Sequence, residues 1–243
     1  MLSTILLFIC IILSILTFFS KRKEPVIETI HDYDYASMCD VLTYDQTKHD
    51  NEITFLNTFL SSSSVVLDVG SGTGHHVNSL KNTSIIGIDN DASMIKFSRK
   101  TYPHEYIYGD ALNASMFSSE SFTHILCLYY TLYYMKDKSL FFKNAYQWLM
   151  PGGYLIVHVA DEWVYGPTST LKGGITYTST LKHTKHREVI SYKHKQIRKE
   201  TYIYMEPISD IQTLALNEGF TYDSRYVYGV PYQNQYLYVF KKK

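Results

Sequence analysis

The sequence has few cysteines, no excess of charge of either sign and no internal repeat. Its three cysteines, Cys10, Cys39 and Cys127, are odd in number and far apart, which excludes a disulfide framework and a CxxC metal site. Lys+Arg and Asp+Glu each number 23, so the net charge gives no reason to expect nucleic acid as the main partner. With 243 residues and 45% hydrophobic residues, we expect one packed domain of ordinary size in a reducing compartment.

The one long uncharged hydrophobic run lies at the N-terminus, from Leu2 to Phe19, and a basic cluster, KRK, follows it at 21–23. As a helix this run would be about 27 Å long, close to the roughly 30 Å thickness of a bilayer's hydrocarbon layer. A cleaved signal peptide is an alternative, but a basic n-region and a small-x-small cleavage site are both missing. A buried core helix is another. We predict a single-pass transmembrane anchor over residues 1–20, with the rest of the chain on the cytosolic side.

A polar stretch follows the anchor and is predicted to be a linker over residues 21–50. Its tyrosines Tyr33, Tyr35 and Tyr44 are candidates for a lid over a ligand. After it, over residues 51–243, short β-branched runs alternate with helical segments, a pattern typical of a parallel sheet with helices on both faces. The predicted strands are Val65–Val69, Ser84–Ile88, Tyr106–Tyr108, Thr123–Leu128, Tyr154–Val159, Thr221–Tyr228 and Gln235–Phe240, and the predicted helices are His75–Leu80, Asp91–Lys100, Asp137–Leu149 and Ile208–Asn217.

The clearest motif, VVLDVGSGTG, spans Val65 to Gly74. An apolar strand carrying an acid ends here, and glycines at alternate positions lead into a helix. Without side chains at these positions a ligand can approach the backbone, and the unpaired N–H groups at the start of the helix attract a polar group. We therefore expect a small polar ligand to be bound by Asp68, Gly70, Ser71, Gly72, Thr73 and Gly74.

The next two predicted strands also end in acidic residues. Asp89, followed by Asn90, comes directly after the second strand, where a carboxylate accepts hydrogen bonds from a ribose 2′,3′-diol. Asp110 and Ala111 follow the third strand, and a side-chain oxygen beside a small residue suits the edge of an adenine ring. These residues together predict a nucleoside site at one edge of the sheet.

The ordered motifs resemble the class I S-adenosylmethionine-dependent methyltransferases, and in particular methyltransferase type 11/25-like domains. The resemblance runs from residue 55 to about 159 and includes the L-x-PGG turn at Leu149–Gly153. It implies an α/β, Rossmann-like, doubly wound seven-stranded sheet whose last strand is antiparallel. It also implies S-adenosylmethionine as the cofactor, with Gly70–Gly74 along the methionine part, Asp89 on the ribose, and Asp110 with Ala111 at the adenine.

A dinucleotide-dependent oxidoreductase is the main alternative for the glycine motif. The fingerprint of that class is GxGxxG, and here His75 stands where the third glycine is needed. The spacing therefore favours the methyltransferase form. A scaffold that binds S-adenosylmethionine without catalysis stays open as a third hypothesis.

The candidates for a catalytic role are weaker, and we name no firm catalytic residue. Tyr129 follows the fourth strand in the group Tyr129, Tyr130, Tyr133 and Tyr134, two of which are equally well explained as core aromatics. His158 and Asp161 end the fifth strand and are placed to position or deprotonate a substrate, although a structural histidine is an equal reading of His158. His75 and His76 begin the first helix, where a cofactor contact and a surface position are both reasonable. No metal is expected, since methyl transfer needs alignment more than acid–base help.

A basic segment interrupts the alternation after the fifth strand. Residues 172–199 contain eight Lys or Arg against one acid, Glu188, and the patterns at Ile175–Leu181 and Glu200–Met205 predict a β-ribbon within an insertion at 168–205. The resemblance implies a substrate-binding addition at this point of the chain. A solvated hairpin and contact with anionic lipid headgroups are two other interpretations. Nucleic acid is a further one, without a recognisable binding signature. We expect a membrane-anchored methyltransferase with a small-molecule or lipid acceptor; its oligomeric state is open.

Overall fold

The computed structural model describes residues 35–38, 42, 44–81, 83–162, 168–171, 175–192 and 195–243. The anchor expected over residues 2–19 and the lid candidate Tyr33 lie outside this part of the chain. Within the ranges just given, no helix combines the length and the apolar character that crossing a membrane requires.

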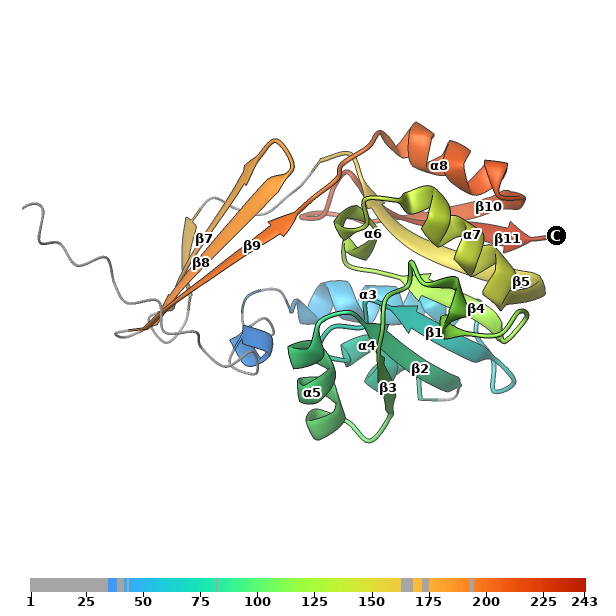
Figure 1. Cartoon of the computed structure of the whole chain (residues 1–243), viewed down its shortest axis with the longest axis horizontal. Helices are drawn as coiled ribbons and strands as arrows, with labels where there is room; N and C mark the ends of the chain where they lie inside the picture. Colours follow the sequence, from blue (N-terminus) through green and yellow to red (C-terminus); the bar gives the residue numbers. More distant parts are fainter. Residues whose placement is uncertain are drawn as a thin grey trace, which may run out of the picture.

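The central element is a seven-stranded sheet with the strand order β10-β11-β5-β4-β1-β2-β3 (Figure 1). Its strands are β1 (Val65–Val69), β2 (Ser84–Asp89), β3 (Glu105–Tyr108), β4 (Phe122–Cys127), β5 (Leu149–Ala160), β10 (Phe220–Val227) and β11 (Gln235–Lys242). The neighbours among β1 to β5 pair in parallel, whereas β11 pairs antiparallel with both β5 and β10. The predicted seven-stranded α/β sheet with an antiparallel last strand is confirmed.

Helices cover both faces of this sheet. They are α3 (Gln46–Leu56), α4 (His75–Ser79), α5 (Ala92–Thr101), α6 (Thr131–Tyr134), α7 (Lys138–Trp148) and α8 (Ile208–Asn217), with a 3₁₀ turn at Ala114–Met116. Asp45, Asp91 and Asp137 cap the starts of α3, α5 and α7, since each side chain accepts a hydrogen bond from a first-turn N–H group. Helix α3 spans the boundary expected at residue 50, so the domain's first packed helix begins within the segment predicted as a linker.

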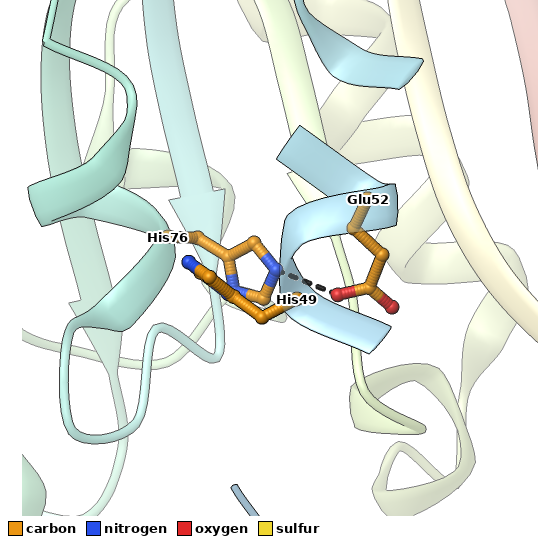
Figure 2. A group of neighbouring side chains, drawn as sticks. All are labelled: His49, Glu52 and His76. Carbon is orange, nitrogen blue, oxygen red and sulfur yellow. Dashed lines mark hydrogen bonds and ion pairs between the residues drawn. The ribbon is translucent and has the colours of Figure 1, made fainter. Parts of the chain in front are cut away.

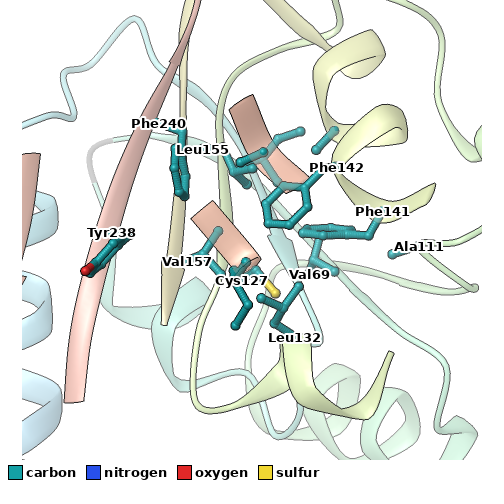
Figure 3. Packing of buried hydrophobic residues seen from close by; sticks show 14 of the residues in the cluster. Val69, Ala111, Cys127, Leu132, Phe141, Phe142, Leu155, Val157, Tyr238 and Phe240 are labelled. Carbon is teal, nitrogen blue, oxygen red and sulfur yellow. The ribbon is translucent and has the colours of Figure 1, made fainter. Parts of the chain in front are cut away.

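Two hydrophobic clusters hold the helices to the sheet, one on each face. Leu67 of β1 faces the cluster that contains Phe141 and Phe142 of α7 (Figure 3), whereas its neighbour Val66 faces the cluster that contains Leu56 of α3. All five side chains are fully buried. Because adjacent strand residues point to opposite faces, both layers brace the same strands and fix their carboxyl ends in space.

The insertion after β5 is a separate four-stranded antiparallel sheet that extends away from the seven-stranded one (Figure 1). Its strands are β6 (Thr168–Leu171), β7 (Ile175–Lys182), β8 (Lys185–Tyr192) and β9 (Lys195–Tyr202). The predicted β-ribbon insertion after β5 is confirmed as an antiparallel sheet. Apolar alternation did not mark β8, because that strand buries the polar side chains of His186 and Glu188 beside Ile190. The strand expected at Glu200–Met205 ends at Tyr202, since the Tyr204 N–H group turns back to bond Tyr133 O at 2.8 Å.

Candidate functional site

A cleft of about 840 Å³ opens at the carboxyl ends of β1, β2, β3 and β4. Nearly all the residues predicted to bind the cofactor line it: Asp68, Gly70, Ser71, Gly72, Thr73, Asp89, Asn90, Asp110, Ala111 and Tyr129. Gly74 does not line the cleft. It ends the loop, and a Cβ built on it would meet the side chains of Tyr106 and Ser98. The cleft thus brings together side chains from separate strand ends, as the pattern of acids predicts.

The glycine-rich loop after β1 needs two of its glycines for different reasons. Gly70 has φ +68°, and a side chain there would collide with Thr131 at the start of α6. Gly72 has φ +53°, and a Cβ built on it meets no atom within 4 Å, so its backbone faces the open cleft. Gly70 lets the loop close onto α6, and Gly72 leaves space for a ligand to approach the backbone.

Asp89 links this loop to the end of β2. Its Oδ2 accepts a hydrogen bond from the Gly72 N–H group (2.9 Å), and its Oδ1 accepts one from the Asp91 N–H group (2.8 Å). Burial raises the pKa of Asp89, and the two N–H donors oppose that rise. An ionised carboxylate has about four acceptor sites, so each oxygen retains capacity for a ligand hydroxyl.

Asp68 lies deeper in the same cleft, at the end of β1. Asp68 is only 2% exposed, and this burial raises the pKa of its carboxyl group to about 7. The positive charge of the nearby His76 lowers the same pKa. A carboxyl group in this state changes charge near neutral pH, so a cationic ligand beside it would favour the ionised form.

The end of β3 forms another wall of the cleft. Asp110 is exposed and its Oδ1 accepts from the Leu112 N–H group at 2.9 Å. Ala111 is buried, and its carbonyl oxygen accepts from Asn144 Nδ2 of α7 at 2.9 Å. These bonds hold the small residue and the adjacent carboxylate in fixed positions on the cleft wall.

The four tyrosines after β4 divide into two pairs. Tyr130 and Tyr133 are buried in the hydrophobic cluster under α7, whereas Tyr129 and Tyr134 line the cleft. Tyr129 adopts φ +46°, and its ring lies between Lys48 Nζ (4.6 Å from the ring centroid) and the His76 ring (5.4 Å between centroids). The strained backbone therefore turns one tyrosine toward the cleft and the next into the core.

His158 and Asp161 do not line the cleft, which argues against a direct catalytic role for either. His158 is fully buried; its Nδ1 accepts from the Tyr130 N–H group (2.9 Å), and its Nε2 lies 3.2 Å from Gln235 Oε1. Burial and the positive charge of Lys48 hold the pKa of His158 well below its ordinary value. Asp161 is exposed and accepts a hydrogen bond from Tyr236. The structure favours the structural reading of His158.

The mouth of the cleft contains two of the predicted lid candidates, Tyr35 and Tyr44, together with side chains of the insertion that sequence reasoning did not assign individually to the site. Glu188 of β8 is 8% exposed and accepts hydrogen bonds from Tyr177 (2.7 Å) and Tyr35 (3.1 Å), and Lys199 of β9 pairs with Asp91 at 3.1 Å. The lining contributed by the insertion and the N-terminal segment comprises Tyr35, Tyr44, Glu188, Lys199, Thr201, Tyr202 and Tyr204. Glu188 is the one acid in the basic segment at 172–199, and this was the sequence feature that could have marked it as a residue of the site.

His75 and His76 both line the cleft, but each is held by neighbouring side chains. Tyr44 stacks on His75 with ring centroids 4.0 Å apart. His76 Nε2 lies 2.9 Å from Glu52 Oε2, in a buried ion pair between α4 and α3. Burial disfavours the charged form of His76, but the hydrogen bond and charge of Glu52 outweigh it and raise the pKa. The pair of histidines fastens α3 and the residues before it to the glycine-rich loop.

The donors and spaces in this cleft fit a nucleoside that carries positive charge. Ser71 Oγ is buried and has no hydrogen-bond partner among the described residues, so a polar ligand group is needed to satisfy it. The space beside Gly72 and the remaining acceptor sites of Asp89 supply a cradle and a ribose anchor. The carboxylates of Asp68 and Asp110 add negative potential to the same cleft.

Comparison with known proteins agrees with this interpretation. Residues 67–157 match the family described as "Methyltransferase domain". Protein 235L of Invertebrate iridescent virus 6, which is named as a methyltransferase, is 34% identical over 100 residues. That match covers 40% of this chain, and the chain spans about a third (33%) of the viral protein's length.

Solved structures with low sequence identity share the fold. An S-adenosylmethionine-dependent methyltransferase from Clostridium acetobutylicum aligns with a TM-score of 0.69 at 15% identity, covering 86% of this chain and 98% of that one. CalS10 from Micromonospora echinaspora, an amino pentose methyltransferase, was solved with S-adenosylmethionine bound. It aligns with a TM-score of 0.65 at 15% sequence identity, covering 86% of this chain and 97% of that one. The chain therefore has the fold of these methyltransferases, and the comparisons support S-adenosylmethionine as the ligand of the cleft.

Proposed function

We propose that this chain is an S-adenosylmethionine-dependent methyltransferase, held at a membrane by residues 2–19, that methylates a small-molecule or lipid acceptor. One observation carries the enzymatic part: the ends of β1, β2 and β3 bring Asp68, Asp89 and Asp110 into one cleft beside an open glycine-rich loop. The match of residues 67–157 to a methyltransferase domain supports it further.

The residues of the cleft have separate tasks in holding the cofactor. Asp89 would accept hydrogen bonds from the ribose hydroxyls, Asp110 and Ala111 would face the adenine, and the backbone of Gly70–Thr73 would border the methionine part. When bound, the cofactor supplies a methyl group on a positively charged sulfur. Asp68 and Asp89, as carboxylates, favour binding of that charge over binding of the neutral thioether product.

Orientation is the main contribution that the chain makes to the reaction. Three imidazoles line the cleft, those of His49, His75 and His76, and they are engaged with the side chains of Ser79, Tyr102 and Glu52 respectively. Aligning an acceptor atom with the reacting carbon supplies several kcal/mol without a general base. The Tyr129 ring, positioned by its backbone conformation and by the Lys48 ammonium over its face, is the surface on which we propose that the acceptor packs.

The acceptor is proposed to enter past the insertion. Tyr134 and Tyr202 line the cleft and are 44% and 56% exposed, which provides aromatic surface for an acceptor with an apolar body. Lys185 and Arg187 of the insertion pair with Glu200, so only part of its positive charge is free to face a lipid headgroup. This surface favours a small molecule or lipid over nucleic acid.

The membrane part of the proposal rests on the length and composition of Leu2–Phe19 and on the basic cluster after it. Carbonate extraction of membranes from cells that express the full chain tests it separately. We expect the chain to stay in the membrane pellet. Release of the intact chain into the supernatant would contradict the proposed anchor.

Labelled cofactor tests the activity. The full chain is incubated with S-adenosylmethionine labelled on the methyl group and with lipid, small-molecule, protein and RNA fractions. We expect label in the lipid or small-molecule fraction. Label in RNA or protein would overturn the acceptor class, and binding of the cofactor with no label transferred to any fraction would indicate the scaffold instead.

A further inference from the structure

Three buried side chains beside the cleft form a cluster with the composition of a zinc site. His49 and Glu52 extend from α3 and His76 from α4; His76 and Glu52 face each other, and the His49 ring lies beside that of His76 (Figure 2). One ligand atom of each lies within 4.8 Å of the others, and the three residues are 3%, 0% and 8% exposed. We propose that this cluster binds a divalent transition-metal ion of the Zn²⁺ type through two imidazoles and one carboxylate.

An unsatisfied nitrogen is the observation that points to a ligand. His49 Nδ1 is buried and has no hydrogen-bond partner in the part of the chain described, whereas its Nε2 lies 2.9 Å from Ser79 Oγ. A neutral imidazole whose second nitrogen is held in this way is the usual state of a metal ligand. Among the described residues, no hydrogen bond accounts for the burial of this nitrogen next to a histidine and a carboxylate.

The outer partners of the cluster are also those that a metal site requires. Ser79 Oγ holds the far nitrogen of His49, and the Tyr228 hydroxyl donates a hydrogen bond to Glu52 Oε1, which leaves Oε2 toward His76. Such partners orient ligands and fix their tautomers. Lys48, one turn from Glu52 on the same helix, directs its ammonium to Gln235 Oε1 at 2.8 Å.

The geometry requires only a small adjustment. Zinc bonds nitrogen and oxygen at about 2.0–2.2 Å, which spaces tetrahedral ligand atoms about 3.3 Å apart. The 2.9 Å between His76 Nε2 and Glu52 Oε2 must open slightly, and ligand atoms that lie up to 4.8 Å apart must move closer together. His49 and His76 both line the cleft, which gives the ion an entry path and a position for a fourth, solvent ligand.

Binding exchanges a proton for the metal. The proton that His76 Nε2 shares with Glu52 Oε2 leaves to solvent, and both atoms then bond the ion, as does His49 Nδ1. The ion would join α3 to α4, the helix that follows the glycine-rich loop. It would therefore brace the loop from outside, with no role in methyl transfer itself.

Titration of Zn²⁺ into the full chain tests this site without any methyl acceptor or cofactor. A chain without a histidine tag is stripped with a chelator and studied by calorimetry. We expect one ion per chain with a Kd of about 1 µM or tighter. No binding at about 100 µM Zn²⁺, or binding of more than one ion with equal affinity, would overturn the proposal.

Variants locate the ion. We expect His49→Gln to weaken Zn²⁺ binding at least about 100-fold, because it removes a metal ligand. Ser79→Ala should weaken it about 10-fold, because it removes the hydrogen-bond partner that orients this ligand. His183→Ala, at an exposed turn of the insertion, is the matched control and should leave Kd unchanged. Equal affinity in His49→Gln and the wild type, or a loss in His183→Ala, would place the metal elsewhere.

Cobalt provides a measurement that does not depend on how the variants fold. Co²⁺ bound by nitrogen and oxygen in a four- or five-coordinate site absorbs visible light far more strongly than octahedral aqueous Co²⁺. We expect such bands in the wild type and in Ser79→Ala. A spectrum identical to that of aqueous Co²⁺ would contradict the site, whether or not the chain transfers methyl groups.

Discussion

The backbone N–H group of Gly72 donates a hydrogen bond to Oδ2 of Asp89 at 2.9 Å, and so joins the glycine-rich loop after β1 to the end of β2. One carboxylate thus fixes the loop and presents its remaining acceptor sites to the cleft. We expect Asp89→Ala to weaken S-adenosylmethionine binding about 10- to 100-fold, since hydrogen bonds to a charged group contribute about 1.5–3 kcal/mol. Calorimetric titration measures this. Asp223→Ala, an exposed acid of β10, is the control, and equal Kd values for both variants would contradict the ribose assignment.

Gly72 allows a test that separates backbone strain from the space a ligand needs. Gly72 and Gly152 both have positive φ (+53° and +78°), and a Cβ on either meets no atom within 4 Å, but only Gly72 lines the cleft. Alanine at either position should lower the free energy of unfolding by about 1 kcal/mol. Only Gly72→Ala should also weaken cofactor binding, because its methyl group occupies the cleft. Loss of affinity in Gly152→Ala, or none in Gly72→Ala, would show that the cofactor does not pass beside Gly72.

Local patterns were sufficient to predict this part of the site. Asp68 and Asp89 stand in the last two positions of apolar strands, and Asp110 follows another. Parallel strands bring their carboxyl ends to one edge, so three local signals determine one cleft. The inserted β-ribbon was also predicted, but its strand β8 was not, because the buried face of β8 carries His186 and Glu188. Polar residues that are satisfied inside a small sheet remove the periodicity on which strand prediction depends.

Contacts between distant segments were beyond sequence reasoning. Tyr35 and Glu188 are separated by 153 positions and meet only because the insertion folds back over the cleft. His49 and His76 share no motif spacing, and they approach because α3 packs on α4. Conversely, His158 and Asp161 were placed near the site by their position at the end of a strand, but β5 runs on to Ala160 and neither lines the cleft.

Stability should fall as the pH is lowered through the ordinary titration range of histidine. His158 is neutral in the folded state, because protonation of Nδ1 would oppose the Tyr130 N–H group and add charge beside Lys48. Its folded pKa lies well below 6.5, so the unfolded chain binds more protons below that value, and stability is present above pH 6.5 and lost on acidification. At pH 5.5 the loss from this residue is about 1.4 kcal/mol.

Urea unfolding at pH 7.5 and pH 5.5 measures this loss. His49, His124 and His186, whose pKa values are also lowered by burial, contribute in the same direction, whereas His76, whose pKa is raised beside Glu52, contributes in the opposite one. The wild type alone therefore does not isolate His158. The variant His158→Gln should be less stable at pH 7.5 but show a smaller decrease between the two pH values. An unchanged decrease in His158→Gln would contradict the neutral, hydrogen-bonded state of this histidine.

The contact between Lys199 and Asp91 should control how the acceptor is held, because it joins the insertion to the N-terminal cap of α5 across the mouth of the cleft. Lys199 Nζ lies 3.1 Å from Asp91 Oδ2 and 3.8 Å from the centroid of the Tyr35 ring. Both charges are partly exposed, so the pair contributes at most about 1 kcal/mol to global stability. Its larger effect is on the relative position of β9 and α5, which form facing walls of the cleft.

We therefore expect Lys199→Met to raise the KM for the acceptor about 3- to 10-fold while leaving the Tm and the cofactor Kd nearly unchanged, once the acceptor is known from the labelling experiment. Arg198→Met is the matched control, since Arg198 is the next residue on β9, is exposed and does not line the cleft. Steady-state kinetics and calorimetry on both variants provide the comparison. If Lys199→Met weakened cofactor binding as strongly as Asp89→Ala, the insertion would belong to the cofactor site. If the two methionine variants were indistinguishable, the insertion would have no part in binding the acceptor through this contact.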